Sequence, residues 1–212
     1  TAKKRFLTKL NDTILQPRNL DYKVQFTGPT GTNSVETAIK LARTIKGRSN
    51  IVAFTNAFHG LTMGALSVTG NTFYRDEAHI SRSNVSFMPY DSYLGPDVNT
   101  MDYFRKLLSD NSSGLDLPAA VIVECIQAEG GVNVASAQWL RDLAMVCYDY
   151  DILLIIEDIQ VGNGRTGDFF SFEEAGIKPD MVAQSKAIGA GLPLALLLLR
   201  PDLDQWKPGE HT

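Results

Sequence analysis

Two acidic side chains and one lysine stand at points of this sequence where buried strands are expected to end. Glu157 and Asp158 directly follow the apolar run 152–156, which has the length and β-branched content of a strand buried on both faces. Lys186 follows a second, shorter run, 181–183. Ligands of open parallel sheets bind outside the carboxyl ends of the strands. An amine and a pair of acids at one such edge therefore form a candidate site.

These side chains suit the chemistry of a bound aromatic aldehyde. A lysine amine is a nucleophile toward an aldehyde, and a carboxylate can keep a pyridine nitrogen protonated so that the ring withdraws electrons. Successive strand side chains point to opposite faces, so only one of the two acids can face such a ring. Taken alone, the pattern is weak, because most lysines are solvated and acids after a strand often cap a loop.

A glycine turn at Gly31 and Thr32 is expected to lead into a helix over about 33–45. Asn33 and Glu36 have the spacing of a capping box at the start of that helix. Backbone N–H groups and the helix dipole suit a phosphate there, although plain glycine turns before helices are common. The Gly-Lys-Ser/Thr ending of a nucleotide P-loop is missing.

The remaining elements must bring these groups together. Strands that alternate with helices predict a parallel α/β sheet. Strands are expected at 24–26, 51–54, 119–123, 152–156, 181–183 and 194–199. Helices are expected at 4–15, 33–45 and 101–108 and after Ser136, and 71–96 is expected to be irregular.

Composition limits the class of protein. The 212 residues are 44% hydrophobic, which suits one core of ordinary size and a single domain. A net charge of −4 gives no reason to expect a nucleic acid or an anionic membrane as partner. Cys125 and Cys147 lie in apolar runs and are expected to be buried free thiols. With no apolar run long enough to span a bilayer and no signal peptide, a cytoplasmic protein is expected.

Several ordered motifs resemble one enzyme family. The motifs are 157–160 (Glu-Asp-Ile-Gln), 164–167 (Gly-Arg-Thr-Gly) and the segment 180–186, and they resemble the class III, or omega-type, aminotransferases, which use pyridoxal phosphate (PLP). Within that family, 28–33 and 206–211 are most similar to the diaminobutyrate aminotransferases of the ectoine pathway. The resemblance runs along the whole chain.

The resemblance implies a fold and an assembly. It implies the large domain of a fold type I PLP-dependent transferase, an α/β domain with a mostly parallel central sheet flanked by helices in three layers. Residues 1–212 would be the PLP-binding part of that domain, without its N-terminal segment and the C-terminal small domain. The whole enzyme is expected to be a homodimer or higher homo-oligomer.

The resemblance also assigns residues. Lys186 matches the lysine that bonds to PLP and moves the substrate proton, and desolvation is expected to lower its pKa. Glu157 matches the acid at the pyridine nitrogen, where the family usually has aspartate; it usually has glutamate at the Asp158 position. Glu129 matches a substrate-side residue whose arginine partner is expected outside this chain. The implied cofactor-binding set is Gly31, Thr32, Phe58, His59, Glu157, Asp158, Gln160 and Lys186, with no metal.

Within the set, Gly31 and Thr32 would contact the phosphate, Phe58 would stack on the ring, and Gln160 would bind the ring hydroxyl. A Phe-His pair in a loop more often packs against the protein than contacts a cofactor, so the cofactor role is assigned less firmly to His59 than to Phe58.

The implied reaction is amino transfer from L-glutamate to L-aspartate 4-semialdehyde, giving L-2,4-diaminobutyrate and 2-oxoglutarate. Another class III ω-amino acid transaminase, an aminomutase, and a truncated homologue without catalysis are the alternatives. Substrate range in this family depends mostly on residues outside 1–212.

Overall fold

A seven-stranded sheet forms the centre of the molecule in a computed structural model, which describes residues 1–75 and 84–210. The strand order is β1-β9-β8-β7-β4-β2-β3. The strands are β1 (Lys23–Gly28), β2 (Ile51–Phe54), β3 (Val85–Met88), β4 (Ala120–Val123), β7 (Leu153–Glu157), β8 (Met181–Gln184) and β9 (Ala195–Leu199). A separate two-stranded ladder joins β5 (Ile126–Gln127) to β6 (Asn133–Val134).

Six of the seven strands point in the same direction. Each neighbouring pair from β3 through β2, β4 and β7 to β8 is parallel. Strand β9 is antiparallel to both β8 and β1. The predicted α/β fold with a mostly parallel sheet is therefore confirmed, with one reversed strand near the β1 edge.

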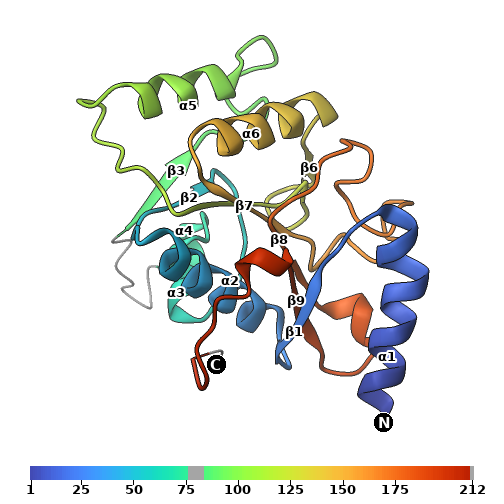
Figure 1. Cartoon of the computed structure of the whole chain (residues 1–212). Coiled ribbons are helices and arrows are strands. Elements are labelled where there is room, and N and C mark those ends of the chain that lie inside the picture. Colours follow the sequence, from blue (N-terminus) through green and yellow to red (C-terminus); the bar gives the residue numbers. More distant parts are fainter. Residues whose placement is uncertain (76–83, 211–212) are drawn as a thin grey trace.

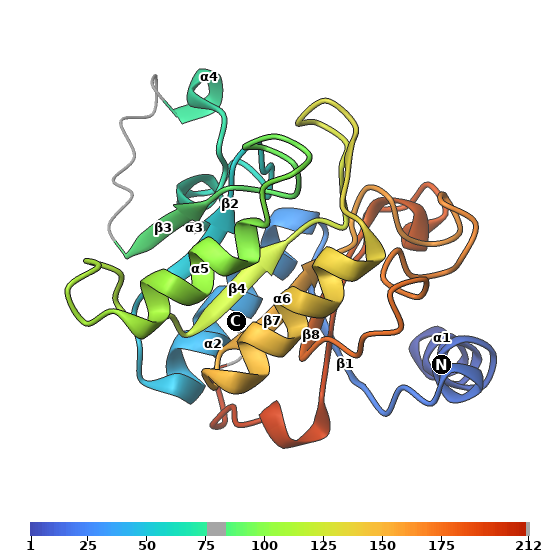
Figure 2. The same cartoon turned by 90° about the horizontal axis from the view of Figure 1, so that it is seen from above.

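Helices cover both faces of the sheet (Figures 1 and 2). Helix α2 packs on one face with the core residues Val35, Ala38 and Ile39, and α5 and α6 pack on the other with Phe104 and Leu143. The α-helices are α1 (Ala2–Leu10), α2 (Gly31–Lys46), α3 (Met63–Ser67), α4 (Thr72–Arg75), α5 (Thr100–Ser109) and α6 (Ala137–Asp149). Short helical turns are η1 (Asn11–Leu15), η2 (Gln16–Arg18), η3 (Lys186–Gly189) and η4 (Pro201–Leu203). This gives the expected three layers.

Three local expectations were wrong. The first helix is α-helical only to Leu10 and continues as the π-turn η1 and the 3-10 turn η2. Strand β3 and helix α4 occupy part of 71–96, which we expected to be irregular; residues 76–83 of that segment lie outside the described residues.

The third error concerns the start of α2. The helix begins at Gly31 with Thr30 as its N-cap, and the Thr30 N–H and hydroxyl both donate to Asn33 Oδ1. Asn33 therefore occupies the third helical position, and it does not cap the helix together with Glu36. Glu36 instead binds the loop before α3, as described below.

Two other sequence observations have structural counterparts. Cys125 and Cys147 are both free and buried, as predicted. Among the described residues, every helix is too short or too polar to cross a bilayer.

Replacement of Leu143 tests the packing of α6 on the sheet. Leu143 is fully buried, and Leu143→Ala should lower the free energy of unfolding by about 2–5 kcal/mol, because it removes apolar contacts and leaves a cavity. The matched control is Met145→Ala on the exposed side of the same helix, which should change it by less than about 0.5 kcal/mol. Equal losses in urea unfolding of the two variants would contradict this packing.

Candidate functional site

The carboxyl ends of β4 and β7 place two glutamates side by side. Val123 pairs with Ile156 in the parallel register, so Glu124 and Glu157 follow at the next position of their strands. Ile122 and Ile155, two residues earlier, both belong to the core under α2. Because side chains alternate along a strand, both glutamates lie on the α2 side of the sheet. Both are buried, with 4% of their surface exposed.

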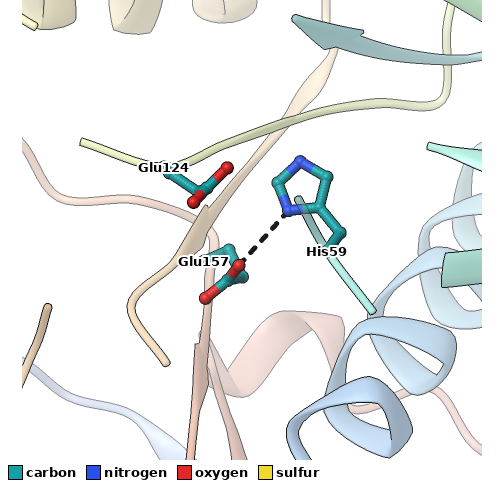
Figure 3. Close-up of side chains that lie close together, drawn as sticks. All are labelled: His59, Glu124 and Glu157. Carbon is teal, nitrogen blue, oxygen red and sulfur yellow. Dashed lines mark hydrogen bonds and ion pairs between the residues drawn. The ribbon is translucent and has the colours of Figure 1, made fainter. Parts of the chain in front are cut away.

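His59, from the loop after β2, completes a buried trio with these acids (Figure 3). A ring nitrogen of His59 and one carboxylate oxygen of each glutamate all lie within 4.8 Å of one another. His59 Nδ1 is 3.4 Å from Glu157 Oε2. The other ring nitrogen, Nε2, is buried and has no hydrogen-bond partner among the described residues.

The Glu157 carboxylate is held in place from its own loop. The backbone N–H of Ile159 donates to Glu157 Oε1 at 2.8 Å, and Oε2 faces His59. One oxygen is thus fixed by the main chain, and the other faces the imidazole. Glu157 and His59, which the sequence placed in one site, do lie together.

Glu124 connects the trio to Phe58. The Phe58 backbone N–H donates to Glu124 Oε1 at 2.9 Å. The Phe58 ring is half-buried and contacts Tyr74 edge to face at 5.3 Å between centroids. Phe58 and Tyr74 also line a cavity of about 340 Å³ that Glu129 and Gly130 border.

Electrostatics sets Glu124 apart from an ordinary carboxyl. Burial raises its pKa well above the usual range, and the nearby Glu157 raises it further. The Phe58 hydrogen bond and the charge of Lys186 act in the opposite direction but do not cancel the rise. Glu124 therefore favours its protonated form more than a solvent-exposed glutamate would.

Asp158 does not join this group, although the sequence placed it in the cofactor-binding set. Asp158 Oδ2 accepts from the Ser171 backbone and the Gln184 side chain, each at 3.3 Å. A Cβ on Gly162 would lie 2.5 Å from the same oxygen, which explains the glycine there. Leu154 and Ile156, of the same strand parity, belong to the core under α6. Asp158 thus lies on the opposite face from Glu157, and its burial raises its pKa to about 6.

The turn at the start of α2 reaches the site through Ile159. A Cβ on Gly31 would lie 2.8 Å from Ile159 Cδ1, so only glycine allows this close approach. Thr32 Oγ1 is 2.7 Å from Thr62 Oγ1, and Glu36 Oε1 accepts from the Thr62 hydroxyl at 2.6 Å. The Asn33 N–H donates to the Thr30 carbonyl at 3.0 Å, which leaves the Gly31 and Thr32 N–H groups as the ones suited to an anion.

Lys186 follows β8 at the same edge. It is the first residue of η3 and has φ 52°, in the left-handed region that is uncommon for non-glycine residues. Its side chain is exposed, so neighbouring protein atoms do not supply the desolvation that we expected. It is close enough to Glu124 for its charge to influence that carboxyl.

Gln160 and Glu129 contact each other at the rim of the site. Gln160 Nε2 donates to Glu129 Oε1 at 2.9 Å. Glu129 therefore has a hydrogen-bond partner within this chain, in addition to the arginine that the resemblance places outside it.

Sequence reasoning missed Glu124, Thr62 and Glu36 as parts of this region. Glu124 could have been found, because it directly follows a buried strand, which is the argument that selected Glu157. Thr62 and Glu36 carry no such signal, since their contact joins two segments 26 residues apart.

Comparison with known proteins identifies relatives along the whole chain. The family described as "Aminotransferase class-III" matches residues 4–212. Proteins named diaminobutyrate--2-oxoglutarate transaminase are 69% identical over 212 residues in Wolinella succinogenes and 59% identical over 213 residues in Halomonas elongata. The chain is covered completely, but it spans only 50% and 51% of those two proteins.

Solved structures share the fold. An amine transaminase from an uncultivated Pseudomonas species, in a PLP-bound form, has a TM-score of 0.81 and 27% identity over 94% of this chain and 48% of its own. The taurine:2-oxoglutarate aminotransferase of Bifidobacterium kashiwanohense, in complex with PLP and glutamate, has a TM-score of 0.82 and 28% identity over 96% of this chain and 47% of its own.

Asp158→Asn tests the electrostatic position of Asp158. Since the pKa of Asp158 in the folded state is raised from 3.8 to about 6, the native protein binds a proton at Asp158 more tightly than the unfolded chain does. Protonated Asp158 therefore stabilises the fold at low pH, and this stabilisation is lost as pH rises through 6. Asparagine has no such charge. The stability of D158N relative to wild type should therefore rise between pH 4 and 7, by on the order of 3 kcal/mol.

Urea unfolding at several pH values measures this difference. The exposed Asp168, changed to Asn, is the control in the same loop. Parallel stability curves for D158N and wild type would contradict the raised pKa.

Proposed function

The chain belongs to the class III aminotransferases, a PLP-dependent family, and we propose that it forms the PLP-binding part of an enzyme that transfers an amino group from L-glutamate to L-aspartate 4-semialdehyde. The products would be L-2,4-diaminobutyrate and 2-oxoglutarate. The names of the relatives pair these two compounds, and this supports the substrate assignment. The similarity of 28–33 and 206–210 to ectoine-pathway enzymes supports a role in that pathway, in a cytoplasmic homodimer; His211 lies outside the described residues.

The residues at the sheet edge suit a flat, phosphorylated ring. The buried Nε2 of His59 has no partner among the described residues, so a polar ligand atom at this position would satisfy it. The N-terminus of α2 at Gly31 and Thr32 offers N–H groups for a phosphate. Phe58 offers an aromatic face. This unsatisfied buried nitrogen beside a fixed carboxylate is the observation that carries the proposal.

PLP, when bound, supplies an aldehyde carbon and an electron-withdrawing ring. Lys186 Nζ would hold the cofactor by condensing with its aldehyde, whose oxygen would leave as water, and the freed amine would serve as the base that moves the substrate proton. Its left-handed backbone fits this role, because strained conformations of non-glycine residues cluster at functional sites.

Glu157 would hold the proton of the ring nitrogen. Its carboxylate is already fixed by the Ile159 N–H and stands beside His59, so it needs little reorganisation to act. The extra methylene, compared with the aspartate that the family usually has, is accommodated by this fold-back onto the loop. Asp158, on the other face, would support the strand end without touching the ring.

Glu129 and Gln160 would act where substrate enters. Gln160 would bind the ring hydroxyl. Its side chain also donates a hydrogen bond to Glu129, which lines the 340 Å³ cavity. A substrate that recruits Glu129 must therefore compete with this hydrogen bond.

Cofactor binding gives the first test. With PLP, the purified protein should develop a visible absorbance band, and borohydride should trap a PLP adduct on the peptide that contains Lys186. Lys186→Ala should abolish both. As a control, replacement of the exposed Lys178, which precedes β8, by alanine should leave both the band and the adduct unchanged. No band in the wild type, or an adduct on another lysine, would refute the assignment.

Activity gives the second test. Repeated turnover of glutamate to 2-oxoglutarate should require aspartate 4-semialdehyde as the amino acceptor. As amino donor, glutamate should have a higher kcat/KM than taurine or simple amines. Glu157→Gln should lower kcat on the order of 10²-fold, because it removes the charge at the ring nitrogen, whereas Glu157→Asp should retain activity. Equal use of unrelated acceptors would favour a broader ω-amino acid transaminase.

A further inference from the structure

We propose that Glu124 is a positioning residue for the cofactor: its side-chain oxygen holds the Phe58 main chain and so fixes both the Phe58 ring and His59 beside Glu157. This inference rests on the proposed PLP site. It assigns a role to a buried carboxyl that touches none of the reacting atoms.

The position of Glu124 is itself fixed. The residue follows β4 directly and is 4% exposed. The buried Tyr90 hydroxyl lies 2.8 Å from the carbonyl oxygens of both Glu124 and Cys125, and so anchors the main chain on either side of this side chain. A carboxyl anchored in this way can act as a rigid acceptor.

A single hydrogen bond then connects two strand ends. Glu124 Oε1 accepts from the Phe58 N–H at 2.9 Å, which joins the end of β4 to the loop after β2. The next residue, His59, donates its own N–H to Thr69 Oγ1 at 3.0 Å. The loop is therefore held at two consecutive N–H groups, and these set where the Phe58 ring and the imidazole lie.

The surroundings favour the uncharged form of Glu124. Glu124 and Glu157 are both buried on one face beside His59, and a carboxylate oxygen of each lies within 4.8 Å of the other and of a His59 ring nitrogen. Two carboxylates this close oppose simultaneous ionisation. Glu129 adds negative charge, and Lys186 is the positive group that acts on the carboxyl. An uncharged carboxyl still offers its carbonyl oxygen to the Phe58 N–H.

Two substitutions separate this role from alternatives. Glu124→Gln keeps the carbonyl oxygen and has no charge at any pH, so it mimics the uncharged acid. Glu124→Met has a similar length and removes the acceptor. The exposed Glu174, changed to Gln, is the matched control away from the loop after β2.

The measurement is amide hydrogen exchange at Phe58 in the cofactor-free protein, followed by PLP titration with visible circular dichroism. In E124M the Phe58 amide should exchange about fivefold faster and PLP should bind about tenfold more weakly, with an altered dichroic band. E124Q and E174Q should match the wild type in all three readouts.

Each other outcome overturns the proposal. Unchanged Phe58 exchange in E124M would show that the hydrogen bond does not hold the loop, and E124Q behaving like E124M would show that the charge is required. If E124M does not fold, E124Q alone decides, since accelerated exchange there contradicts an uncharged acceptor. Failure of PLP to bond to Lys186 would refute the proposed function but leave the exchange result interpretable, because that readout needs no cofactor.

Discussion

The parallel register of β4, β7 and β8 is the constraint on which the rest of the site depends. Val123 pairs with Ile156, and Glu157 pairs with Ala183, so the three strands end at nearly the same level. Because side chains alternate between faces, this register decides which acids meet. A shift of one residue in β7 would bring Asp158 to the α2 face and send Glu157 to the α6 face.

Much of the fold was predictable because its strands are short apolar runs between turns. The exception, β3, lies at the sheet edge and alternates with the polar Ser86, so its sequence lacks the continuous apolar run of a central strand. Alternation predicted that only one of Glu157 and Asp158 could face a ring, and the structure shows them on opposite faces. The reversal of β9 was not predictable, because strand direction depends on how the chain returns and not on local composition.

The parts of the site that sequence did not reveal are contacts between distant segments. Glu124 binds a backbone N–H 66 residues away, and Glu36 binds Thr62 and the first turn of α3 across 26 to 29 positions. Neither contact leaves a local pattern, and the helix-capping pattern misassigned Glu36. Local sequence does show which kinds of group stand at the strand ends: acids, an amine and a glycine turn before a helix. Packing alone decides that Glu124 and Glu157 lie together on one face of the sheet and that Asp158 lies on the other.

The contact between Gly31 and Ile159 has a consequence for ligand selection. Ile159 follows Glu157 by two residues and donates its N–H to that carboxylate, while its side chain meets the first residue of α2. The turn at the start of α2 and the acid are therefore linked through Ile159, and glycine at position 31 allows their close approach. A side chain at position 31 would push the start of α2 away from Ile159, and would so change the distance that any ligand contacting both the turn and the Glu157 carboxylate has to span.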